Sequence, residues 1–200
     1  MLDILQLFMD LASGDDALAE IAAHRIASFG ERAIAALAYL LDSEDADTRW
    51  WAVRTLALIV VTEAGAMLRE ALSDDDLAVR QCAALGLRTN PHVEAIPALI
   101  ASLHAQDQLL RRLSADAIIA VGAEAIPALS EIMQSGPQTA RLEAVRALAK
   151  MKIEDAIPIL FAYMTPLKKP FYRGEREERR EKLKTRLKNS HHNLSKVQKF

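Results

Sequence analysis

A short string of residues recurs along the chain at a nearly constant interval. The pattern Ala-Ile-Pro-Ala-Leu stands at 95–99 and 125–129, with variants at 33–37 and 156–160 and weaker copies at 3–7 and 64–68. The first positions are 3, 33, 64, 95, 125 and 156, so the intervals are 30 or 31 residues. Such a fixed period is typical of repeat proteins, in which each unit packs only against its neighbours.

A second string, Arg-x-x-small-small-x-small-Leu/Ile, keeps the same phase. It begins at Arg49, Arg80, Arg111 and Arg141, in each case 16 residues after the first position of its own unit. Two independent patterns with one phase across four units indicate a real structural repeat.

Each unit predicts two short helices. In the first helix, Ile34, Leu37 and Leu41 follow the i, i+3, i+7 spacing of one helical face. Prolines stand early in this helix, where a missing N–H costs little: Pro97, Pro127 and Pro158. An acidic turn follows, with an aspartate well placed to cap the second helix in all units but the fifth, which has Pro137 there: Asp15, Asp45, Asp76 and Asp107.

Composition supports this interpretation and extends it to the whole fold. The chain has 35 Ala and 28 Leu among 200 residues but only 7 Gly and 7 Pro, which favours helices over turn-rich sheets. Helical pairs this short cannot bury their own apolar faces, so the units must stack. We therefore expect an all-α fold, an α-solenoid of about five helical pairs plus a terminal helix from about residue 154.

Charge divides the chain into two predicted regions. The repeat array, 1–164, contains 13 basic and 23 acidic residues, whereas the segment 165–200 contains 12 basic and 4 acidic residues. We expect this segment to be a charged tail that is partly helical or disordered, and it could contact an anionic partner through Lys168, Lys169, Arg173 and Arg176. Interleaved glutamates weaken that basic field and favour a solvated tail.

The repeated residues resemble a known family. The strings A-I-P-A-L and V-R-x-x-A-A-x-A-L, joined by an Asp-containing turn, are similar to HEAT repeats of the short phycobilisome-lyase-like class, and the similarity is greatest over 95–122. The resemblance implies an armadillo-like helical solenoid. Because that family includes bilin lyases, scaffolds and regulatory adaptors, it implies binding and little more about function.

Positions one and five after each repeated arginine are predicted to face away from the stack, onto its concave side. The candidate contacts there are Trp50, Arg54, Gln81, Leu85, Arg112, Asp116, Leu142 and Arg146. Trp50 and Arg54 form the most binding-like pair, because Trp and Arg are enriched at interface hot spots. An equally good interpretation is that Trp50 covers a groove between its neighbours, and we expect Trp51 to be packed.

The repeated arginines have two interpretations, an anion-binding ladder or a structural one. Their even spacing beside the turn acids favours a structural ladder, in which Arg49, Arg80, Arg111 and Arg141 bond the acids and carbonyls of adjacent units. Asp45, Asp76 and Asp107 are the acids of that ladder.

No catalytic or metal-binding pattern is present in the sequence. His24, His92 and His104 are scattered and none precedes a Glu, so we predict no metal site and no cofactor. The motifs of nucleotide-binding loops, serine hydrolases and zinc proteases are missing. The single cysteine, Cys82, is expected to be a small structural thiol.

These observations favour a non-enzymatic protein–protein interaction module or scaffold that binds a protein or peptide on its concave face. One alternative, which rests on the family resemblance alone, is a bilin lyase or isomerase-type accessory protein. Another is nucleic-acid binding through the basic tail. We expect a cytoplasmic monomer with no transmembrane segment, since the longest apolar run, 56–62, is far too short to cross a bilayer.

Overall fold

The computed structural model describes residues 4–151 together with Ile157 and Phe161. The chain divides into two compact units, residues 1–156 and 157–200. The predicted tail contacts Lys168, Lys169, Arg173 and Arg176 lie outside the described residues, as does most of the helix expected from about residue 154. The boundary between array and tail near residue 164 stays a prediction.

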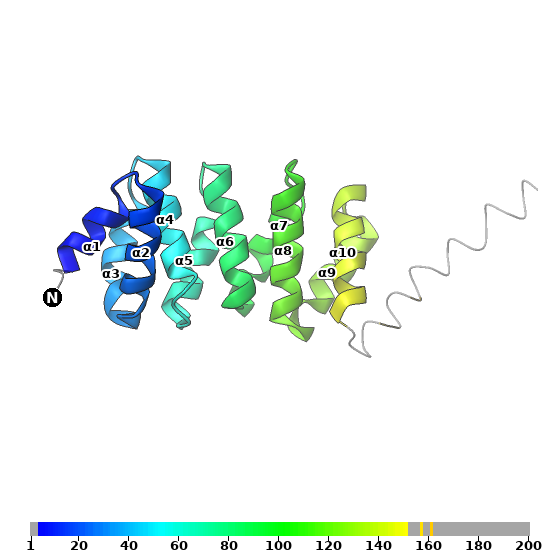
Figure 1. Ribbon diagram of the computed structural model, residues 1–200. Coiled ribbons are helices and arrows are strands. Elements are labelled where there is room, and N and C mark those ends of the chain that lie inside the picture. Colours follow the sequence, from blue (N-terminus) through cyan, green and yellow to red (C-terminus); the bar gives the residue numbers. More distant parts are fainter. Residues whose placement is uncertain (1–3, 152–156, 158–160, 162–200) are drawn as a thin grey trace, which may run out of the picture. The chain divides into compact units, whose positions relative to one another are not determined.

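Residues 4–151 form helical pairs in the predicted phase (Figure 1). The pairs are α1 (Ile4–Leu11) with α2 (Asp16–Ala27), α3 (Ile34–Leu41) with α4 (Ala46–Leu56), α5 (Thr62–Ala71) with α6 (Leu77–Thr89), α7 (Ile96–Ser102) with α8 (Gln108–Val121), and α9 (Ile126–Ser135) with α10 (Gln138–Met151). Short 3₁₀ turns, Gly30–Ala33, Val93–Ala95 and Ala123–Ala125, lead into α3, α7 and α9. The expected all-α solenoid of five pairs is confirmed.

Local sequence signals set where these helices begin. Asp15, Asp45, Asp76 and Asp107 precede the second helices of the first four pairs, and each side chain accepts a hydrogen bond from a backbone N–H in the first turn. Pro97 and Pro127 lie in the first turns of α7 and α9.

The second helices form one row, which we call the even-numbered row: α2, α4, α6, α8 and α10. Each packs against the next member of this row, and Figure 1 shows them side by side. Alanines make the close approach possible, because Ala52, Ala83, Ala115 and Ala144 are fully buried. Helices α3, α5, α7 and α9 each contribute a leucine at the fifth position of the repeated string, and these four are fully buried: Leu37, Leu68, Leu99 and Leu129.

A glycine sets the spacing between the second and third pairs. A Cβ on Gly86 of α6 would lie 2.8 Å from the Ala57 Cβ and 3.0 Å from the Leu68 Cδ2, closer than such atoms pack. Only a residue without a side chain lets α6 approach this closely.

Candidate functional site

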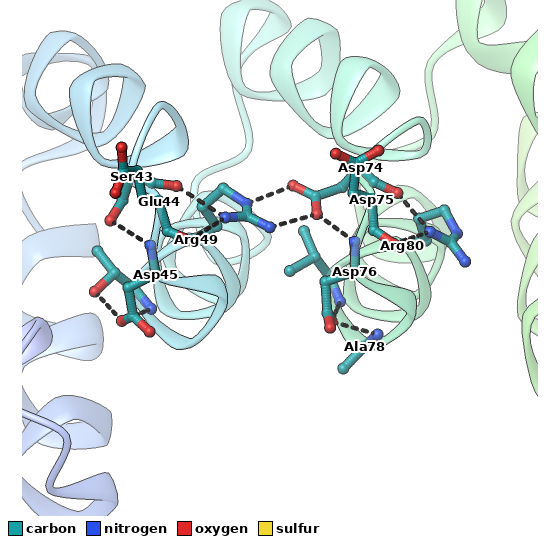
Figure 2. A network of polar contacts seen from close by, with 11 residues as sticks. Ser43, Glu44, Asp45, Arg49, Asp74, Asp75, Asp76, Ala78 and Arg80 are labelled. Atoms are coloured by element: carbon teal, nitrogen blue, oxygen red, sulfur yellow. Dashed lines mark hydrogen bonds and ion pairs between the residues drawn. The ribbon is translucent and has the colours of Figure 1, made fainter.

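The turns between the two helices of the second, third and fourth pairs, 42–45, 73–76 and 104–107, form what we call the turn edge. Figure 2 shows the first two of these turns. Here the Nη1 atoms of Arg49, Arg80 and Arg111 each donate to two backbone carbonyls, five and six residues earlier in the chain. The carbonyls belong to the arginine's own unit, not to the adjacent unit as expected. Each arginine lies in the first turn of the second helix, so its guanidinium is next to the turn that precedes this helix. The carbonyls of that turn are therefore its nearest acceptors.

The other edge of Arg49 reaches the next unit. Its Nε donates to the Asp74 Oδ2 at 2.8 Å and its Nη2 to the Asp74 Oδ1 at 3.0 Å. Burial by itself raises the pKa of Asp74, but hydrogen bonds from Arg49 and from the Asp76 N–H together hold that pKa below its usual value. This planar two-bond pair fixes the α4 unit against the α6 unit.

The acids of the expected ladder play a different part. The side chains of Asp45, Asp76 and Asp107 cap their own helices, and in the described part of the chain these carboxylates make no hydrogen bond with the guanidinium groups of Arg49, Arg80 or Arg111. The expectation that they pair with the repeated arginines was wrong, because a capping carboxylate is turned toward the helix N–H groups. Hydrogen bonds from Leu110 and from the Gln81 side chain lower the pKa of Asp107.

Arg141 stands apart from the other three arginines. Its turn contains Pro137 instead of a capping aspartate, although its backbone N–H donates to the carbonyl of that residue at 2.9 Å, as the N–H groups of the other three arginines do to their aspartates. Its Nε is buried and has no hydrogen-bond partner among the described residues.

On the even-numbered row, four of the eight candidate contacts are tied to neighbouring helices. Arg54 Nη2 bonds Glu20 Oε1 of α2 at 2.9 Å, and Gln81 Nε2 bonds Asp107 Oδ1 at 3.0 Å. Arg146 Nη1 bonds Asp116 Oδ1 of α8 at 2.9 Å. These four side chains are partly buried and link adjacent helices of the row, which lie within reach of long polar side chains, and the expectation that they contact a partner stays a prediction.

Asp116 lies at the centre of the last of these bridges. Burial raises its pKa, whereas Arg146 and Lys150 lower it, and the net shift is downward. Arg146 also bonds Glu143 Oε2 at 2.6 Å, so that one guanidinium holds two carboxylates between α8 and α10.

The other four candidates differ in exposure. Leu85 is 41% exposed and Leu142 is 64% exposed, and Arg112 is exposed with no described partner for its guanidinium. Trp50 is partly buried, with its ring centroid 4.8 Å from that of Trp51 in a perpendicular arrangement. Trp51 is only 7% exposed. The row therefore presents apolar and aromatic side chains between fixed ion pairs.

The remaining reactive groups have structural surroundings. Cys82 is buried, and burial raises the pKa of its thiol to about 12. His24 bonds Glu20 on the exposed side of α2. Over residues 4–151, no three metal-ligating side chains gather as a metal site requires. No helix in the described ranges is long and apolar enough to cross a membrane.

Two residues that were not among the predicted partner contacts or ladder residues, Glu20 and Asp74, organise these contacts. For Asp74 a signal was available, because it stands six residues before Arg80, at the place occupied by Ser43, Ala105 and Ser135 in other units. An acid at only one of four equivalent positions marks a contact special to that interface.

Stacked helical pairs with a repeated turn-edge arginine define an α-solenoid. The family model for HEAT repeats matches residues 4–88, 34–119 and 96–173, and the chain belongs to the HEAT-repeat family. The predicted family is therefore confirmed.

Several solved structures share this fold. The complex of CpcE and CpcF of phycocyanin lyase from Nostoc sp. PCC7120 superimposes with a TM-score of 0.59 at 22% identity, covering 72% of this chain and 96% of that one. A designed armadillo repeat protein in complex with the peptide (KR)4 gives 0.52 at 19% identity, covering 88% and 95%. An engineered protein gives 0.51 at 25% identity, covering 82% and 86%. A comparison with curated protein sequences gives no match.

Proposed function

We propose that this chain is a non-enzymatic binding module that recognises a protein or peptide on the outward surface of its even-numbered row. The observation on which the proposal rests is the exposure of Leu85 and Leu142 on α6 and α10, with Trp50 partly exposed on α4. Apolar groups set among charges on one continuous surface are typical of interaction sites.

The row is also suited to binding by its rigidity. The bridges from Arg54 to Glu20 and from Arg146 to Asp116 hold neighbouring helices in fixed register. A surface whose side chains are already ordered loses less conformational entropy when a partner binds. Closer packing along the even-numbered row than between the first helices is expected of the inner row of a curved stack. This supports a concave binding face.

The proposal is tested with a charge change at the two exposed leucines. The full chain with Leu85→Glu and Leu142→Glu is compared with the wild type in affinity capture from the source cells, followed by titration of the captured partner. The matched control changes two exposed apolar residues outside the row, Tyr39→Glu and Val60→Glu, which are 80% and 74% exposed. We expect the first variant to lose the partner and the control to keep it. Equal binding by all three proteins would refute the assignment of the surface.

The predicted tail contacts are tested separately in the full chain. Changing Lys168, Lys169, Arg173 and Arg176 together to Gln removes their charge without shortening the protein. If the partner is lost only in this variant, and wild-type binding falls steeply with salt, recognition belongs to the tail and to an anionic partner such as a nucleic acid.

The bilin lyase alternative is supported only by the shared fold of the phycocyanin lyase complex. Co-expression of the chain with a bilin and an acceptor protein tests it. Covalent transfer of colour to the acceptor would replace the scaffold proposal with an enzymatic one.

A further inference from the structure

Two cavities on the turn edge are equivalent by repeat position. One of about 530 Å³ lies beside Arg49 and one of about 370 Å³ beside Arg80. Five residues lining the first have counterparts 31 residues later in the second: Leu41 and Leu72, Asp42 and Ser73, Arg49 and Arg80, Ser73 and His104, Asp74 and Ala105. The same place in the fold is therefore present twice with different chemistry.

The difference lies in the carboxylates. The cavity beside Arg49 is lined by four acidic residues, Asp42, Glu44, Asp74 and Asp75, and Asp74 fills the fork of the guanidinium. The cavity beside Arg80 has no acidic residue in its lining. At the position of Asp74 it has Ala105, whose methyl group accepts no hydrogen bond.

Arg80 is held in the same way as Arg49. Its Nη1 donates to the carbonyls of Asp74 and Asp75, so the guanidinium is fixed by its own turn. Its Nε and Nη2, which correspond to the two atoms that bind Asp74 in Arg49, have no partner in residues 4–151 (Figure 2). An arginine fork that is already oriented matches the two oxygens of a carboxylate.

We propose that the cavity beside Arg80 is a binding site for a carboxylate, supplied by an Asp or Glu side chain of a partner protein. The incoming carboxylate would bond the Arg80 Nε and Nη2 as Asp74 bonds Arg49. The walls are small, with Ala98, Ala101 and Ala105, and leave room for a side chain together with part of its backbone. Exposure of Ala101 and His104 opens the cavity to solvent.

This site lies on the turn edge and not on the outward surface of the even-numbered row, so it does not depend on the function proposed above. A partner that uses both surfaces would place an acidic side chain at the end of α6 while its apolar groups contact Leu85. An experiment can therefore refute the carboxylate contact at Arg80 without refuting the apolar contact at Leu85, and the reverse.

The test follows the Nε–Hε signals of Arg49 and Arg80 by NMR on the ¹⁵N-labelled full chain. Sodium acetate is titrated against sodium chloride at equal ionic strength, which removes general screening effects. We expect a saturable shift of the Arg80 signal with acetate only. Arg49 is the internal control, because Asp74 already occupies its fork, and its signal should not move.

Ala105→Asp is the decisive variant, since it places in the second cavity the acid that the first one has. We expect its Arg80 signal to be shifted before any acetate is added, and the response to acetate to be lost. A blocked Gly-Asp-Gly tripeptide should reproduce the acetate shift in the wild type, and blocked Gly-Asn-Gly should not.

Three results would overturn the proposal. The first is an Arg80 signal that responds equally to acetate and chloride. The second is an unchanged acetate response in Ala105→Asp. The third is a response to acetate but none to the Asp tripeptide, which would assign the cavity to a small free carboxylate.

Discussion

Replacing Asp74 by Ala should weaken the interface between the second and third helical pairs in a measurable way. The change removes two charge-assisted bonds to Arg49, at 2.8 and 3.0 Å, and the bond accepted from the Asp76 N–H at 2.8 Å. Hydrogen bonds to charged groups contribute about 1.5–3 kcal/mol, and breaking a fully buried ion pair costs about 3–5 kcal/mol.

Breaking the Arg49–Asp74 pair should cost less than the ~3–5 kcal/mol of a fully buried ion pair. The Arg49 and Asp74 side chains are 15% and 13% exposed, so water reaches the arginine once its partner is gone. The neighbouring interface already accommodates Arg80 opposite Ala105 without an acid in the cavity lining. We therefore expect Asp74→Ala to lower the free energy of unfolding by about 2 kcal/mol.

The assay is urea unfolding of the full chain followed by far-UV circular dichroism. Because repeat arrays can unfold in parts, amide hydrogen exchange of α4 and α6 is measured in parallel. Asp75→Ala is the matched control, since Asp75 is exposed and its side chain makes no described hydrogen bond. A loss below about 0.5 kcal/mol, the size of an ordinary surface change, would refute the reasoning.

The same pair should respond to pH in a defined direction. The pKa of Asp74 is lowered in the folded protein, so its contribution is fully present above the unfolded value of about 3.9 and is lost as pH falls through the lower folded value. The stability difference between wild type and Asp74→Ala should therefore shrink in acid. A difference independent of pH would show that the carboxylate charge is not involved.

Three further predictions concern other interfaces. Asp116→Ala should cost about 1–2 kcal/mol and speed amide exchange in α10, because it removes the carboxylate of α8 that Arg146 and Lys150 of α10 bond; unchanged exchange there would contradict it. Gly86→Ala should lower the thermal midpoint, since overpacking against Ala57 costs about 1–3 kcal/mol and outweighs a helix-propensity gain of about 1 kcal/mol. Cys82 should react with a disulfide reagent only as fast as the fold opens, because the thiol is buried with a pKa raised to about 12; rapid labelling of the folded protein would contradict its burial.

The sequence was sufficient to predict the features that depend only on a single repeat unit and on the repeat period. The caps at Asp45 and Asp107 and the early proline Pro97 follow from local backbone chemistry, so their positions could be predicted. Burial of Leu99 followed from the spacing of apolar residues on one helical face.

Contacts between units could not be predicted in the same way. The pairing of Arg54 with Glu20 joins residues 34 apart, and it depends on the rotation of one helical pair against the next. Sequence periodicity fixes which residues are equivalent but not that rotation. For this reason Arg54 and Arg146 were predicted only as partner contacts, and their bonds to Glu20 and Asp116 of the neighbouring helices were not foreseen.

The turn-edge arginines also make the order of the units matter. Each guanidinium holds its own turn with one nitrogen and presents the other two to the unit that follows, as Arg49 does to Asp74. If the units that begin at 64 and 95 exchanged places, Arg49 would meet Ala105 and lose its acid, while Asp74 would stand opposite Arg111. Repeats with the same backbone are therefore not interchangeable in this chain. To lengthen or shuffle the array, each arginine would have to be transferred together with the residue of the next unit that its guanidinium faces, as Arg49 faces Asp74.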